Sequence, residues 1–129
     1  MSRTRIRAYR DGIIAESQAA WLYRLKGYRV VAKRYRSPVG EIDLVRSPVG
    51  EIDLVACKGA RLVFVEVKRR KSHDEAAFAV TARRKRRIVR VAQYWIASHP
   101  DFVGRDIAFD VVLCAPWSLP RHIENAFPV

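Results

Sequence analysis

The chain has 129 residues, half of them hydrophobic, which is enough for one domain with its own core. No apolar stretch is long enough to cross a bilayer, and arginines occupy the start of the chain where a signal peptide would be apolar, so the sequence predicts a cytoplasmic protein without a membrane partner. Its 25 Lys and Arg against 13 Asp and Glu give a formal net charge of +12, which favours nucleic acid as the partner because basic side chains neutralise phosphates.

The first half of the chain predicts one helix followed by strands. Residues 11–26 carry apolar side chains at helical spacing and are followed by Gly27, a common helix terminator. Residues 28–36 predict a strand, and "EIDLVA" from Glu51 predicts the next one. Lys58-Gly59 predicts a hairpin turn into residues 61–68, which are β-branched and aromatic and give the strongest strand signal. The apolar stripe of the helix is predicted to be Ile14, Trp21, Leu22 and Leu25.

The second half predicts a basic loop over residues 69–78, a helix over residues 81–98 and a strand over residues 106–114. The apolar stripe of this helix is Ile88, Val91, Ala92 and Trp95. The tail over residues 116–129 contains several prolines and predicts no element. Helices interleaved with strands predict one domain over residues 1–129, of α/β or α+β class, with a central mixed β-sheet flanked by helices.

Two cysteines and three histidines have no spacing typical of a metal site. Cys57 and Cys114 form no CxxC pair, and the histidines show no HxxxH spacing. The sequence therefore argues against a zinc site and against a disulfide framework.

A perfect tandem repeat, "RSPVGEIDLV", occupies residues 36–45 and again residues 46–55. Both copies cannot continue one strand, because Pro48 interrupts it and the strand would be far too long. The short turn after the second copy ties that copy to the next strand, so we expect its acids to be the functional ones. The first copy would form a loop, or would pair with another chain as an exchanged strand and so make a homodimer.

Four charged side chains on the two hairpin strands are predicted to share one face. Successive strand residues point to opposite faces, which groups Glu51 with Asp53 and Glu66 with Lys68. The predicted turn sets Glu51 opposite Glu66 and Asp53 diagonal to Glu66. Crowded carboxylates attract a divalent cation, and Lys68 would help to orient or deprotonate a water that attacks a phosphodiester. The alternative is a set of cross-strand ion pairs.

The helices carry further candidates. Glu16 lies on a partly apolar flank of the first helix, where it would reach the same metal or pair with an arginine. The run "RRKRR" at residues 83–87 begins the second helix, although cations there oppose the helix dipole. Bound phosphate would relieve this conflict, and the alternative is a solvated charge run.

"GEIDLVA", "LVFVEVKRR", "FDVV" and "IENAF" resemble the YraN-like family of small bacterial proteins, grouped with the restriction-endonuclease-like PD-(D/E)xK nucleases, which include Holliday-junction resolvases. The resemblance covers residues 11–127. It implies a restriction-endonuclease-like fold with Asp53 and Glu66 as metal acids, Lys68 as the catalytic lysine, Glu16 as the helical acid and the main-chain carbonyl of Val67 as a further metal ligand. The residues expected to bind nucleic acid are Arg70, Arg83, Arg84, Lys85, Arg86 and Arg87.

The resulting prediction is a nucleic-acid-binding, divalent-metal-dependent endonuclease that uses Mg²⁺ or Mn²⁺ and acts on DNA. One alternative is a non-catalytic nucleic-acid-binding protein on the same fold, since fold does not fix function. Another is a structural partner of a second protein chain, bound through the extra repeat copy as an edge strand.

Overall fold

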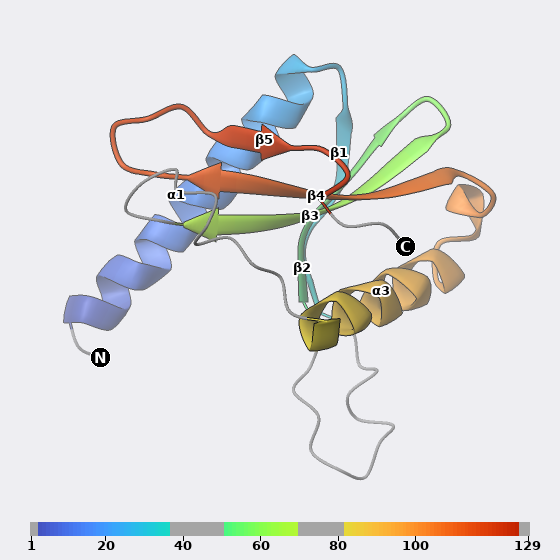
Figure 1. The fold of residues 1–129 in the computed structure, drawn as a ribbon, viewed down its shortest axis with the longest axis horizontal. Helices are drawn as coiled ribbons and strands as arrows, with labels where there is room; N and C mark the ends of the chain where they lie inside the picture. Colours follow the sequence, from blue (N-terminus) through green and yellow to red (C-terminus); the bar gives the residue numbers. More distant parts are fainter. Residues whose placement is uncertain (1–2, 37–50, 70–81, 127–129) are drawn as a thin grey trace, which may run out of the picture.

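A computed structural model describes residues 3–36, 51–69 and 82–126. Figure 1 shows a central sheet with the long helix α1 on one face and α3 on the other. The elements are α1 (Arg3–Leu25), β1 (Arg29–Arg36), β2 (Glu51–Lys58), β3 (Arg61–Arg69), α3 (Ala82–Ala97), the 3₁₀ turn η2 (Pro100–Phe102), β4 (Asp106–Cys114) and β5 (Arg121–Ile123). No helix within these ranges is both long and apolar enough to cross a membrane.

The sheet is mixed and five-stranded, in the order β1-β2-β3-β4-β5. β3 and β4 run parallel and are joined through α3, whereas the other neighbours are antiparallel. The predicted α+β class with a mixed sheet between helices is confirmed, and the arrangement is consistent with a restriction-endonuclease-like fold. The short strand β5 had no prediction, and α1 begins eight residues before the predicted start at residue 11.

Two apolar clusters hold the layers together, one on each face of the sheet. The first packs small and aromatic residues of α1 against Leu54, Val63 and Val112. The second packs the predicted stripe of α3 against Val55, Phe64 and Phe109, and Trp95 is almost fully buried within it. Burial on both faces explains why the central strands β3 and β4 are nearly continuous apolar runs.

Of the apolar stripe predicted for α1, only Leu22 packs against the core, where it is partly buried. Ile14, Trp21 and Leu25 are 55%, 61% and 82% exposed. The buried face consists instead of Ala15, Ala19, Ala20 and Tyr23. Alanine has no bulk beyond its methyl group, so the three alanines let the helix approach the sheet closely, while Ile14, Trp21 and Leu25 remain outside.

The predicted turn at Lys58-Gly59 was also wrong by one residue. Lys58 pairs with Arg61, so Gly59 and Ala60 form the turn, and Gly59 has the positive φ of +58° that such a turn favours. The pairing of β2 with β3 is therefore displaced by two residues from the predicted one. A displacement by two keeps every side chain on its predicted side, because the side-chain period of a strand is two.

Candidate metal centre

The candidate site lies where β2 separates from β3. Their pairing ends at Leu54 and Val65, although β2 continues to pair with β1 as far as Glu51. Beyond that point the Val67 N–H has no β2 carbonyl opposite it and instead donates a 2.7 Å hydrogen bond to Asp53 Oδ2. The divergence of the strands thus fixes the Asp53 carboxylate beside β3.

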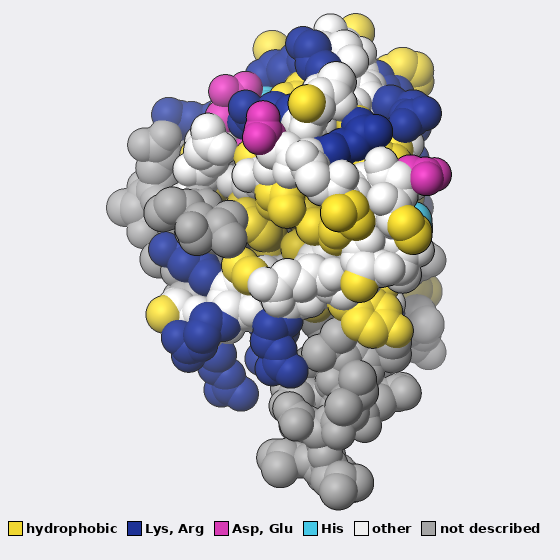
Figure 2. All heavy atoms as spheres, turned by 90° about the vertical axis from the view of Figure 1, so that its right-hand side faces the viewer, with side chains coloured by type: hydrophobic (Ala, Val, Ile, Leu, Met, Phe, Trp, Pro, Cys, Tyr) yellow, Lys and Arg dark blue, Asp and Glu magenta, His cyan; other side chains and the backbone are white. Residues whose placement is uncertain are grey.

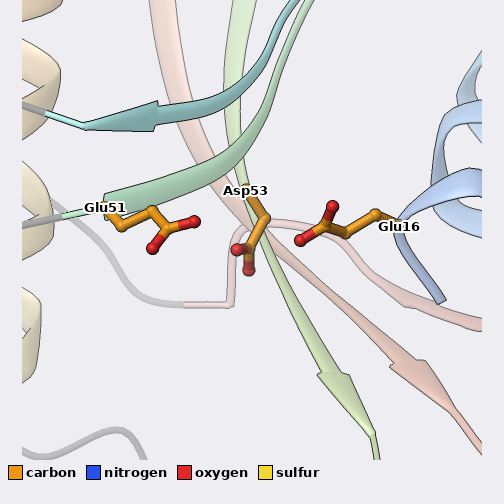
Figure 3. A group of neighbouring side chains, drawn as sticks. All are labelled: Glu16, Glu51 and Asp53. Atoms are coloured by element: carbon orange, nitrogen blue, oxygen red, sulfur yellow. The ribbon is translucent and has the colours of Figure 1, made fainter. Parts of the chain in front are cut away.

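Glu16 of α1 and Glu51 at the start of β2 converge on Asp53, as Figure 3 shows. One carboxylate oxygen from each of the three residues lies within 4.8 Å of the others. Glu16 follows the buried Ala15, so the close approach of α1 to the sheet carries its side chain toward the acids. This three-acid cluster is suited to a divalent cation, since Mg²⁺ and Mn²⁺ prefer carboxylate oxygens.

Asp53 is the most perturbed acid of this cluster. Burial, with a smaller contribution from the neighbouring Glu16, Glu66 and Glu51, raises its pKa to about 6, although the hydrogen bond from Val67 acts in the opposite direction. Without a cation, the cluster therefore holds more negative charge than its surroundings stabilise. A bound cation would remove that conflict.

Glu66 lies beside the cluster on the α3 side, and its oxygens differ. Oε1 accepts hydrogen bonds from Lys68 Nζ at 2.9 Å and from Arg84 Nε at 2.6 Å. Oε2 is buried and has no hydrogen-bond partner among the described residues. An unpartnered buried carboxylate oxygen is costly and rare, so it marks a position that a ligand could satisfy. These residues therefore fit a divalent cation.

Arginines also contact the acids. Arg34, whose φ is +50°, forms an ion pair with Glu16, and Arg36 approaches Glu51 at 3.6 Å. Glu16 thus combines the two arrangements that the sequence left open, since it pairs with an arginine and also joins the acids. Together with Lys68 and Arg84, which contact Glu66, these arginines place a basic side chain beside Glu16, Glu51 and Glu66.

Each predicted site residue can be located except Arg70, which lies outside the described residues. Asp53 lies with Glu16 and Glu51, and Glu66 lies with Lys68 and Arg84. In the basic run of α3, Arg84 reaches Glu66, Arg83 and Arg86 are exposed, and Lys85 and Arg87 are half-buried. Val67 contributes its N–H to Asp53.

A second polar cluster was missed by the sequence interpretation. The fully buried Asp110 of β4 accepts hydrogen bonds at 2.7 Å from Tyr23 Oη and from His122 Nε2, and at 3.0 Å from the Asn125 N–H. Lys26 Nζ lies 2.8 Å from His122 Nδ1.

The only signal for this cluster was an acid inside the apolar run "FDVVLC". Its side-chain partners, Tyr23 of α1 and His122 of β5, are 87 and 12 residues away in the chain, so their spacing gave no indication.

Comparisons with known proteins agree with the resemblance seen in the sequence. The family model described as "Uncharacterised protein family UPF0102" matches residues 15–47 and 45–114. UPF0102 proteins of Bradyrhizobium sp. strain ORS 278 and Bradyrhizobium diazoefficiens are each 48% identical over 126 residues, which cover 98% of this chain and 82% and 87% of theirs. A UPF0102 protein of Rhodopseudomonas palustris strain BisB18 is 48% identical over 123 residues, covering 95% of this chain and 84% of its own.

The two family matches meet inside the tandem repeat. The first contains repeat copy 36–45 and the second contains copy 46–55, and the two matches overlap at residues 45–47. In the structure, "EIDLV" of the second copy forms the start of β2. The first copy lies outside the described residues except for Arg36.

Deleting residues 36–45 should leave a folded and slightly more stable protein. Arg36 pairs with Glu51, so the connection between them shortens from the 14 residues 37–50 to four, a common hairpin length. The lower entropy of loop closure should add about 1 kcal/mol to the free energy of unfolding, measured by urea denaturation. A loss of stability would show instead that the first copy makes contacts the fold needs.

Proposed function

This chain belongs to the uncharacterised protein family UPF0102, and from its acid cluster we propose that it is a divalent-metal-dependent endonuclease that hydrolyses phosphodiester bonds in DNA. The observation that supports the proposal most directly is the convergence of Glu16, Glu51 and Asp53 beside a lysine-bound Glu66. A strongly basic protein supplies the matching affinity for phosphate.

Asp53 would hold the cation together with Glu16 and Glu51, and Glu66 Oε2, which has no partner among the described residues, would be free to add a further contact. Bound Mg²⁺ or Mn²⁺ supplies Lewis acidity and lowers the pKa of a water. The Val67 N–H fixes the orientation of Asp53 without adding charge.

Lys68 and Arg84 act on the other side of the acids. The Lys68 ammonium is 2.9 Å from Glu66 Oε1 and largely shielded from solvent, with 20% of its side chain exposed. From there it can orient an attacking water or stabilise the negative charge that develops on the scissile phosphate. Arg84 forms a second ion pair with Glu66 Oε1. Its side chain is more exposed than that of Lys68, so it can contact the substrate backbone.

Basic side chains are also spread over a wider part of the surface (Figure 2). Figure 2 shows Lys and Arg gathered along the top and at the lower left of one face, around an apolar centre. We expect these side chains to contact phosphates without reading sequence, so DNA affinity should fall steeply as salt concentration rises.

The proposal is tested with labelled single-stranded, duplex and branched DNA and with RNA, incubated with Mg²⁺, with Mn²⁺ or with chelator. We expect cutting only with metal, and loss of cutting in Asp53→Ala, Glu66→Ala and Lys68→Ala. Asp43→Ala, the same change in the other repeat copy, is the matched control and should cut normally. Cutting that survives chelation or the Asp53 change would contradict the proposal.

A non-catalytic nucleic-acid-binding protein is the second candidate, favoured by the ion pairs that Arg34 and Arg84 already form with Glu16 and Glu66. In that case the acid-to-alanine variants bind DNA as well as the parent or better, and no tested substrate is cut. Binding and cutting measured on the same variants therefore separate the two functions.

A further inference from the structure

A groove of about 970 Å³ opens beside the candidate metal centre. It lies between α1 and the ends of β3 and β4, and its lining includes Ile14, Gln18, Lys68 and Arg69. Lys68 belongs both to this lining and to the site around Glu66, so the groove borders that site. Its volume is at the upper end of the range of about 300–1,000 Å³ that ligand pockets occupy.

Trp117 lines the outer wall of the groove, in the segment between β4 and β5. Its side chain is fully exposed, and its φ of +60° lies in the left-handed region that bulky residues rarely adopt. Because its ring is in water and its backbone is strained, Trp117 contributes no burial energy to the stability of the fold. Such strain is typical of functional positions.

We propose that this groove binds an unpaired nucleic-acid strand, with a base stacked on Trp117 and the backbone phosphates beside Lys68 and Arg69. The inference rests on the proposed function and names its substrate class. In a duplex the faces of each base are covered by its neighbours, whereas an unpaired base offers a face to an aromatic side chain. The strand next to the acids would thus be single-stranded or locally opened.

Charge favours this occupant over a protein partner. Ile14 and Leu119 add apolar surface to the groove, which alone would suit a second protein chain equally well. Lys68 and Arg69 line the same groove at the end nearer the acids, and the chain as a whole carries +12. An apolar ring flanked by cations is the combination that single-strand-binding grooves use.

Tryptophan fluorescence can test the stacking directly, because the chain has three tryptophans in different settings. Trp95 is buried, and Trp21 is exposed on α1 but does not line the groove. In a Trp21→Phe protein the accessible emission therefore comes from Trp117. Oligothymidine of about 12 nucleotides and a duplex of the same length are titrated in chelator, so that no cutting occurs.

We expect oligothymidine to quench the emission and the duplex to leave it nearly unchanged. In the otherwise unaltered chain, Trp117→Ala should weaken binding of a dye-labelled oligothymidine about tenfold, Trp117→Phe should retain most of the affinity, and Trp21→Ala should bind like the parent. Trp117 is fully exposed, so these variants should keep their fold.

Three results would overturn the inference: unchanged oligothymidine affinity in Trp117→Ala, equal quenching by the duplex, or a dimer in light scattering that Trp117→Ala dissociates without any change in oligothymidine binding. Failure of the proposed function has a different signature. If oligothymidine binding depends on Trp117 but no metal-dependent cutting occurs, only the proposed endonuclease activity is refuted. If cutting occurs and is unchanged in Trp117→Ala, only the proposed role of the groove is refuted.

Discussion

Asp53→Asn should abolish metal-dependent cutting and, at the same time, make the metal-free protein more stable. The change removes one of three carboxylates whose oxygens lie within 4.8 Å, so it removes both a ligand and a source of repulsion. The asparagine oxygen can still accept the Val67 N–H. We expect cutting to fall by at least about 10²–10³-fold and the free energy of unfolding in chelator to rise by on the order of 1–3 kcal/mol.

The pH dependence gives this prediction a sign. The pKa of Asp53 is raised from 3.8 to about 6 in the folded protein. Above about pH 6 the buried carboxylate is charged and lowers the free energy of unfolding. Below the ordinary pKa of 3.8 it is neutral in both the folded and the unfolded chain, and this loss is absent. The stability advantage of Asp53→Asn should therefore be largest near pH 7 and should disappear toward pH 4. Urea denaturation of both proteins at several pH values measures it.

Asp43→Asn is the matched control, because it makes the same chemical change in the identical repeat copy. It should alter neither cutting nor stability. If Asp43→Asn did the greater damage, the first copy would supply the acids. If only the double change had an effect, the two copies would exchange places in the sheet.

Asp110→Ala should destabilise the protein by about 3–5 kcal/mol, because it removes the acceptor shared by Tyr23, His122 and the Asn125 N–H. The Tyr23 hydroxyl and the His122 ring would remain buried without this acceptor, whereas Asn125 is exposed. Burial alone would raise the pKa of Asp110, but the hydrogen bonds from His122, Tyr23 and Asn125 outweigh it and hold that pKa below its usual value. This stabilisation is thus present at neutral pH and is lost as the pH falls through the acidic range.

Asp106→Ala provides the control, since Asp106 begins the same strand but is exposed. Its free energy of unfolding should change by less than about 0.5 kcal/mol. Thermal and urea denaturation compare the two variants with the parent. A loss below about 1 kcal/mol in Asp110→Ala would show that water replaces the missing acceptor at little cost.

The strands could be predicted well and the helix faces only in part. Residues 106–114 were assigned to their full length, because a run of β-branched and aromatic residues between turn residues leaves few other structures. The stripe of α3 was also predicted, whereas only Leu22 of the stripe predicted for α1 packs against the core. Hydrophobic periodicity gives weight to large side chains, and the buried face of α1 is made largely of alanine.

The candidate site divides in the same way. The hairpin brought Asp53 and Glu66 together in prediction because their spacing is local. The roles of Arg34 and Arg84, and the cluster around Asp110, depend on which elements meet across the sheet. β5 has only three residues and follows Pro120, so its pairing with β4 comes from tertiary contacts and not from its own propensity.

The alanine face of α1 has a consequence for how this site can be altered. Ala15, Ala19 and Ala20 set the distance between helix and sheet, and Glu16 is carried on the same helix. Replacing one of these methyl groups by a larger side chain would push the helix outward and withdraw Glu16 from Asp53. Metal affinity could thus be adjusted by uncharged substitutions in the core, so relatives with identical acids could still differ in the metal concentration they require.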